Sequence, residues 1–104
     1  MVEINKENFD DEILKSPIPA VVDMWGPQCA PCLALMPQVE ELAASYDGKI
    51  KFGKLNVAEN RRLCILLKVM SVPTFLFYKG GECKDRLTGD EVSIENIHAK
   101  ANNL

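Results

Sequence analysis

Two of the four cysteines of this 104-residue sequence stand three positions apart, in the segment Cys29-Ala30-Pro31-Cys32. In the first turn of a helix this spacing places both sulfur atoms on one side, where they can form a disulfide with little backbone movement. Cys29 would begin that helix, where unpaired backbone N–H groups and the positive end of the helix dipole favour a thiolate. Cys32 would lie inside the turn and be shielded. The spacing therefore predicts a dithiol–disulfide couple in which Cys32 attacks a mixed disulfide formed on Cys29.

A second residue that could do chemistry is Asp23, which interrupts an otherwise apolar strand two positions before Trp25. Burial raises the pKa of a carboxyl group, so a buried Asp23 could accept the proton of Cys32 near neutral pH. Lys54, on the strand expected beside it, could tune that pKa. The alternative is an aspartate at a frayed strand end whose oxygen atoms are hydrated.

The remaining cysteines stand singly. Cys64 lies in the apolar run 63–67 and is more simply a buried inert thiol than a regulatory one, and Cys83 follows a glycine pair without a clear role. A four-thiolate zinc or iron–sulfur site normally uses two close cysteine pairs, whereas the sequence has one, so we expect no metal. His98, the only histidine, is expected to be a surface or half-buried residue of the last helix. Three methionines are expected to pack in the core: Met24, Met36 and Met70.

The elements that must position these residues alternate along the chain. Strands are predicted near 2–4, 18–25, 50–57, 74–78 and 82–87, with Gly80-Gly81 as a hairpin signal. Helices are predicted from Asn5 or Asn8 to Ser16, over 30–46 with a kink at Pro37, over 59–69, and from about Val92 to Ala101. The core-facing positions of the second and third helices are taken as Leu33, Met36, Val39, Leu42, Ala43, Leu63, Leu66 and Leu67. The order βαβαβαββα predicts an α/β fold with a mixed sheet covered by helices on both faces.

Composition limits the function classes further. The length suits one domain over residues 1–104, and 47% hydrophobic residues are enough for a core without staples. The formal charge of -3 and the scattered basic residues, of which Arg61-Arg62 is the only adjacent pair, argue against a nucleic-acid surface. No basic head with an apolar stretch opens the sequence, and no apolar run approaches the roughly 18 residues of a membrane span. We therefore expect a cytoplasmic protein without membrane contact.

These residues together resemble the thioredoxin family over essentially the whole chain. The active-site strand and motif are similar in Val22-Asp23-Met24-Trp25 and Cys29-Ala30-Pro31-Cys32, and Pro37 matches the family's helix proline. Lys54-Leu55-Asn56 matches its third strand, Val72-Pro73-Thr74 its segment with a cis proline, and Gly89 the glycine after its last strand. The resemblance implies the thioredoxin fold, with a central mixed sheet flanked by helices on both faces.

The resemblance also implies roles for individual residues. Cys29 would be the nucleophile, Cys32 the resolving thiol, Asp23 the buried base and Lys54 its modulator. The substrate-binding residues would be Trp25, Gln28, Ala30, Pro31, Val72, Pro73 and Gly89. The backbone of Val72 would hydrogen-bond an extended substrate segment. No cofactor beyond the Cys29–Cys32 disulfide is implied, and the partners would be protein disulfides and a thioredoxin reductase drawing on NADPH or ferredoxin, with the chain acting as a monomer.

Two positions depart from the family pattern. Gln28 stands where the family usually has Trp before the nucleophile, and Ala30 where it usually has Gly after it. The first removes a large aromatic side chain from the docking surface, and the second restricts the dipeptide that sets the redox potential. The expected function is therefore general reduction of protein disulfides, and the alternative is a thioredoxin-like interaction module dedicated to one redox partner complex.

Overall fold

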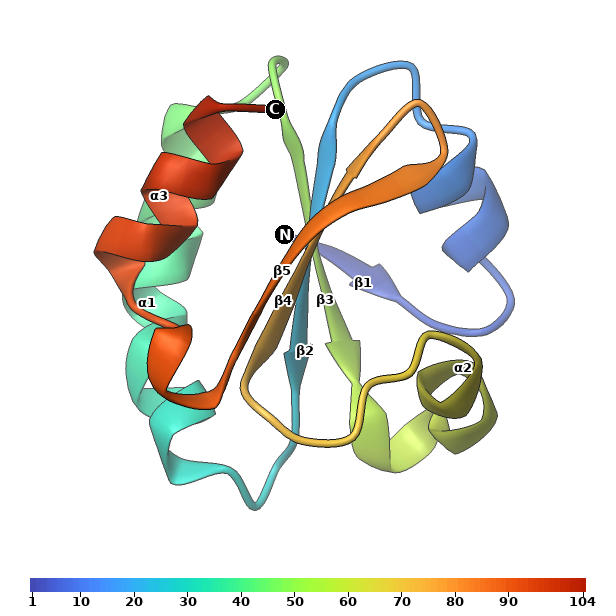
Figure 1. Cartoon of the computed structure of the whole chain (residues 1–104), viewed down its shortest axis with the longest axis vertical. Helices are drawn as coiled ribbons and strands as arrows, with labels where there is room; N and C mark the ends of the chain where they lie inside the picture. The colour runs from blue at the N-terminus through green and yellow to red at the C-terminus, as the bar shows by residue number, and fades with distance from the viewer.

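The computed structural model describes residues 1–104 and is built around a mixed sheet of five strands (Figure 1). In chain order the strands are β1 (Val2–Ile4), β2 (Ala20–Trp25), β3 (Lys51–Asn56), β4 (Thr74–Lys79) and β5 (Glu82–Thr88). Their order across the sheet is β1-β3-β2-β4-β5. β1, β3 and β2 are parallel, whereas β4 is antiparallel to both β2 and β5. The predicted α/β class and mixed sheet are confirmed.

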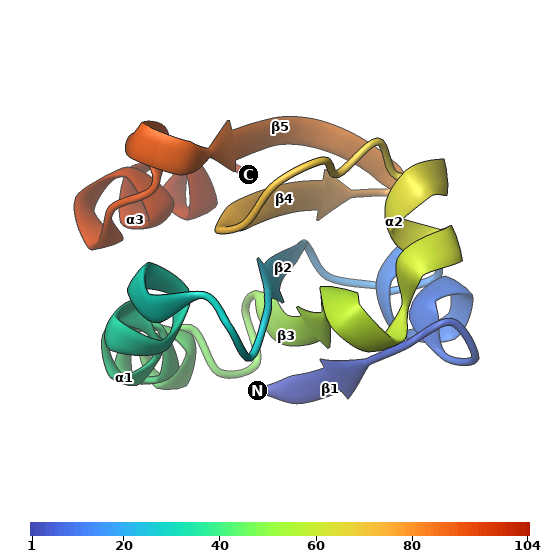
Figure 2. The ribbon, with the colours of Figure 1, turned by 90° about the horizontal axis from the view of Figure 1, so that it is seen from below.

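Helices cover both faces of this sheet (Figures 1 and 2). α1 (Ala30–Ser45) and α3 (Ile94–Asn102) lie on one face, and α2 (Arg61–Leu66) lies on the other with η1 (Asp10–Leu14), a π-helical turn. Two short 3₁₀ turns, η2 (Val57–Glu59) and η3 (Gly89–Glu91), precede α2 and α3. None of the helices combines the length and apolar composition that a membrane crossing needs.

Two helices begin at a capping side chain that the sequence supplies. Oδ1 of Asn5 accepts the backbone N–H groups of Glu7 and Asn8 at 2.9 and 3.0 Å, as a capping residue does, although the regular turns of η1 begin only at Asp10. Ser93 caps α3 in the same way through the N–H of Asn96, at 3.1 Å. α1 continues through Pro37, which has no N–H to donate.

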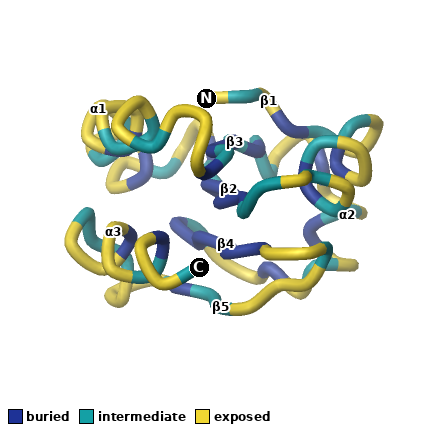
Figure 3. Tube along the Cα trace, turned by 90° about the horizontal axis from the view of Figure 1, so that it is seen from above, coloured by how far each residue is buried: buried dark blue, intermediate teal, exposed yellow.

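β2 is the central strand of the sheet, and its residues from Ala20 to Met24 are all buried (Figure 3). Its side chains alternate between two separate cores. Val22 and Met24 pack with residues of η1, α2 and β4, whereas Val21 packs with residues of α1 and α3. The face that Val21 occupies is also the face of Asp23 and Trp25, since all three share the same parity along the strand.

The prediction of a core position is wrong for three residues. Leu33, Leu66 and Met70 are 47%, 77% and 92% exposed. α2 ends at Leu66 rather than near Val69, because Lys68 adopts a left-handed conformation with φ of 58° that terminates the helix. Met24 is buried as expected, and Met36 is half-buried.

Two glycine positions have structural reasons. Gly80 and Gly81, with φ of 61° and 82°, form the tight hairpin between β4 and β5 that their sequence predicted. Gly53 lies in the middle of β3, opposite Val2 of β1. A Cβ atom there would lie 2.6 Å from Cγ1 of Ile4, so the absence of a side chain lets β1 sit against β3.

Candidate active site

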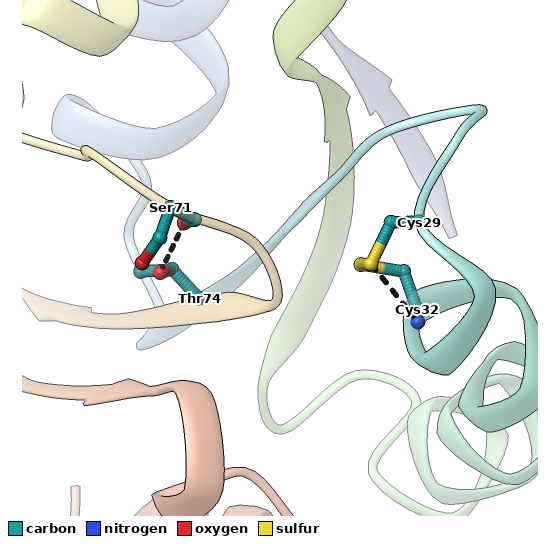
Figure 4. Close-up of a disulfide and its surroundings, with 4 residues drawn as sticks. All are labelled: Cys29, Cys32, Ser71 and Thr74. Atoms are coloured by element: carbon teal, nitrogen blue, oxygen red, sulfur yellow. Dashed lines mark hydrogen bonds between the residues drawn. A yellow bond between two sulfur atoms is a disulfide. The ribbon is translucent and has the colours of Figure 1, made fainter.

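Cys29 and Cys32 form a disulfide in the first turn of α1 (Figure 4). Cys29 is the N-cap of the helix, and its Sγ accepts the backbone N–H of Cys32 at 3.2 Å. The N–H of Cys29 donates to the carbonyl of Gly26 at 3.0 Å, which fixes the loop between β2 and α1. The sulfur of Cys29 is therefore held at a helix N-terminus against an N–H donor, an arrangement that stabilises a thiolate when the disulfide is reduced.

The two sulfur-bearing residues differ in exposure. Cys32 is only 3% exposed, whereas Cys29 is half-buried and lies at the molecular surface. A disulfide of another protein can approach Cys29 and not Cys32. This asymmetry, expected from the sequence, suits one thiol that meets the substrate and a second that acts only within the molecule.

Asp23 lies on the sheet face that α1 covers, and it is 3% exposed. Burial raises the pKa of its carboxyl group from 3.8 to about 7, and the positive charge of Lys54 opposes part of that rise. Lys54 is its register partner on β3. The structure therefore supports a buried titratable group inside the paired strand β2, rather than a residue at a frayed strand end.

The loop before β4 lies opposite the disulfide (Figure 4). The Val72–Pro73 peptide bond is cis, as the resemblance implied. The hydroxyl of Thr74 donates to the carbonyl of Ser71 at 2.7 Å, and the N–H of Gly89 donates to the carbonyl of Pro73 at 3.1 Å. The first bond closes the turn between Ser71 and Thr74, and the second ties Pro73 to the residue that follows β5. Together they hold the backbone of the turn in place opposite the disulfide.

One open hollow, of about 650 Å³, is lined by Cys29, and a second, of about 670 Å³, adjoins it. Both are lined by Pro31 and Val72, so together they form one groove. The first hollow includes Cys29 and runs toward Arg61, and the second runs toward Asp90. Of the predicted substrate-binding residues, the structure gathers six around this groove: Gln28, Ala30, Pro31, Val72, Pro73 and Gly89.

Trp25 is the exception among those residues, since it lines neither hollow. It is half-buried at the end of β2, and its Nε1 is buried without a hydrogen-bond partner. Sequence reasoning missed several groove residues, some further along α1 and the rest from other elements: Ala34, Leu35, Gln38, Val57, Ala58, Arg61, Asp90 and Val92. Only Arg61 carried a signal, as half of the one adjacent basic pair.

The other titratable candidates lie away from this groove. Cys64 is a free, buried thiol whose pKa is raised by burial, and Cys83 is a free thiol on the exposed side of β5. His98 is an exposed residue of α3 whose ring lies edge-on to that of Tyr46. No three His, Cys, Asp or Glu side chains gather in a way that could hold a metal ion.

Comparisons with known proteins agree with this geometry. The family model described as Thioredoxin matches residues 1–102. A protein named thioredoxin from Peptoclostridium acidaminophilum is 46% identical over 99 residues, which are 95% of this chain and 90% of that protein. A thioredoxin from Acetoanaerobium sticklandii is 37% identical over 95% of this chain and 94% of its own length. Thioredoxin 1 from Nostoc sp. is 38% identical over 84% and 81% respectively.

Proposed function

The chain belongs to the thioredoxin family and is a thiol–disulfide oxidoreductase, and from this premise we propose how its residues divide the reduction of a protein disulfide. The observation that carries the proposal is the unequal exposure of the two cysteines, half-buried Cys29 and buried Cys32. The reaction starts from the reduced pair and ends with the disulfide seen in the structure.

In the first step the thiolate of Cys29 attacks one sulfur of the substrate disulfide. The substrate S–S bond breaks, one substrate sulfur leaves as a thiolate, and a mixed disulfide joins the other to Cys29. The N–H of Cys32, which donates to Sγ of Cys29 at 3.2 Å, supports the thiolate form of Cys29 before attack.

In the second step Cys32 resolves the mixed disulfide. Asp23 takes the proton of the Cys32 thiol, directly or through one water, and the new thiolate attacks the sulfur of Cys29. The Cys29–Cys32 bond forms and the second substrate thiolate leaves, so that the chain has lost two electrons and the substrate has gained them. A carboxyl pKa of about 7 is matched to this task, because such a group is partly ionised at neutral pH.

The groove is proposed to hold the substrate as an extended segment. The backbone of Val72, beside the fastened cis turn, would pair with the main chain of that segment, a mode of recognition that tolerates many sequences. Gln28, Ala30, Pro31, Pro73 and Gly89 would contact its side chains. Trp25 would pack behind the cysteines.

The cellular setting is proposed from the same observations. Protein disulfides are the substrates and a thioredoxin reductase, using NADPH or ferredoxin, returns two electrons to the Cys29–Cys32 disulfide. A cytoplasmic location is supported by the free exposed thiol of Cys83, which stays reduced in a reducing compartment. One chain supplies both cysteines, the base and the groove, which supports a monomer acting as one domain over residues 1–104.

Reduction of insulin by dithiothreitol tests the proposal. We expect the wild-type chain to accelerate precipitation of the reduced insulin B chain, and Cys29→Ser to remove the acceleration. A chain that keeps an intact Cys29–Cys32 pair but leaves insulin untouched would contradict general reduction and support a module dedicated to one partner.

A further inference from the structure

An apolar surface patch lies on α2 and the loop that follows it. Ile65, Leu66 and Met70 are 72%, 77% and 92% exposed, which makes them three of the five large apolar side chains that the molecule leaves in solvent. Ile65 and Leu66 are adjacent in α2, and Met70 follows four residues later in the loop, after the exposed Lys68 and the buried Val69. Clustered exposure of this kind marks interaction sites in soluble proteins.

The exposure results from a fixed conformation and not from a frayed helix end. Nη1 and Nη2 of Arg86 on β5 donate to the carbonyls of Lys68 and Leu67, both at 2.7 Å. The N–H of Val69 donates to the carbonyl of Cys64 at 2.9 Å, and both of these residues are buried. The inner side of α2 is therefore anchored, and its outer side is held toward solvent.

The stretch of chain that carries the patch, between Glu59 and Glu82, is positively charged. Residues 60–81 contain four basic side chains and no acidic one, although the whole chain has a net charge of -3. Arg61, Arg62 and Lys68 are all exposed, and the four ion pairs of the structure involve other residues. Their charge is thus available to a partner.

The patch is continuous with the groove beside the disulfide. Arg61, in the first turn of α2, lines the same hollow as Cys29. Met70 stands two residues before Val72, which lines both hollows. A folded protein whose disulfide reaches Cys29 therefore has the outer side of α2 within its footprint.

We propose that this surface, the α2 face, made of Arg61, Arg62, Ile65, Leu66, Lys68 and Met70, is a docking site for an acidic protein substrate. The inference rests on the proposed function, and it adds the chemistry of the partner: apolar side chains flanked by carboxylates, next to the disulfide to be reduced. A second copy of this chain is a poorer occupant, because the basic side chains of two α2 faces would repel one another.

The test uses two synthetic peptides that share one disulfide loop and one leucine-rich segment, flanked by glutamates in one peptide and by lysines in the other. Bis(2-hydroxyethyl) disulfide serves as a small neutral substrate that cannot reach α2. We expect wild type to have a higher kcat/KM for the glutamate peptide, with a preference that shrinks as salt is added.

The variant Arg62→Glu/Leu66→Ser should lower kcat/KM for the glutamate peptide by about tenfold, as loss of an interface hot spot does. It should leave kcat/KM for the small disulfide unchanged, and it should reduce the ratio of kcat/KM between the glutamate peptide and the lysine peptide. Lys49→Glu is the matched control, because Lys49 is an exposed residue between α1 and β3 and its reversal changes the net charge as much as Arg62→Glu does. This control should keep the wild-type preference.

Other outcomes separate the two proposals. Equal rates for both peptides in wild type, or the same loss in Lys49→Glu as in the double variant, would overturn docking on the α2 face while the reductase function stands. Failure of wild type to reduce even the small disulfide would overturn the function itself. Sedimentation of wild type as a dimer that Leu66→Ser dissociates would assign the α2 face to a second copy and overturn the acidic partner.

Discussion

Asp23 of β2 lies in register beside Lys54 of β3, yet the two make no direct ion pair. Burial dominates over the positive charge, so the pKa of the carboxyl group is about 7 rather than 3.8. The folded chain therefore binds a proton between these two pH values that the unfolded chain releases. Stability is lost as pH rises through that window.

Asp23→Asn should remove this pH dependence. The rise in the pKa of Asp23 from 3.8 to about 7 corresponds to a loss of roughly 4 kcal/mol in the free energy of unfolding. This loss is absent below about pH 4 and complete above about pH 7. We expect the variant to match wild type in urea unfolding near pH 4 and to exceed it near pH 8. Exposed Asp10→Asn is the control and should follow wild type. Parallel pH curves for wild type and Asp23→Asn would show that the carboxyl is not buried in solution.

Lys54→Met should move the same titration to higher pH. The lysine lowers the pKa of Asp23, so its removal leaves only the effect of burial. The pH at which the mixed disulfide is resolved fastest should rise, and the midpoint of the stability change should rise with it. Stopped-flow measurement of substrate release from about pH 5 to about pH 9, roughly two units either side of neutrality, gives the first value. A midpoint that does not move would show that Lys54 has no influence on the titration of Asp23.

Cys32→Ser should accumulate a mixed disulfide on Cys29, because the resolving attack is lost, whereas Cys29→Ser should capture nothing. Both variants are best made with Cys83→Ser, which removes the exposed free thiol. After incubation with insulin, mass spectrometry under non-reducing conditions identifies the adduct. An adduct formed by Cys29→Ser would reverse the roles assigned to the two thiols.

Gln28→Trp should change partner choice without changing stability. Gln28 is exposed beside the nucleophile, so the substitution should alter the free energy of unfolding by no more than about 0.5 kcal/mol. The indole supplies rigid contact area, so kcat/KM should shift unequally for two protein disulfides while a small disulfide keeps its rate. Equal changes for all three substrates would mean that residue 28 acts on the chemistry of Cys29 instead.

Arg86→Met should loosen α2 from the sheet. The substitution leaves two carbonyls without their charge-assisted partners and should lower the free energy of unfolding by about 1–3 kcal/mol. It should also raise the rate at which buried Cys64 reacts with a thiol reagent. Lys84→Met, an exposed position of the same strand, is the control and should alter neither quantity. If Cys64 reacted with the thiol reagent at the same rate in Arg86→Met and in Lys84→Met, Arg86 would not be what holds α2 against the sheet.

The sequence was informative where one periodicity dominated. Apolar runs bounded by proline and glycine marked β2 and β4, and the buried stripe of α1 follows Cys32 and Val39 with a helical period. Leu33 stands one position away from that stripe, which explains why an apolar residue of the same turn is exposed. A broad apolar signal showed that α1 exists and overstated how much of it is buried.

The third helix was harder because five consecutive apolar residues, 63–67, define no face. The structure buries Cys64 and partly buries Leu63 and Leu67, and the left-handed Lys68 then turns the chain outward. Lysine carries no local signal for that conformation. The contact that fixes it comes from Arg86, eighteen residues away, and no short-range pattern contains it.

In the candidate site, too, some residues could be predicted from the sequence and others could not. Its cysteines follow from spacing, and the buried state of Asp23 follows from its apolar neighbours. The groove does not, because Arg61, Val57 and Asp90 reach it from three different elements. Only the packing of those elements brings them to the two adjoining hollows of the groove.

The glycine at position 53 also determines which strand forms one edge of the sheet. Behind β1, a strand of three residues, lies β3, a strand of six whose backbone could pair with another chain if it were uncovered. Because a side chain at residue 53 would collide with Ile4, only glycine lets the short strand cover that edge. At this edge of the sheet the outermost strand is then only three residues long, and so short a strand offers little template for pairing with another chain.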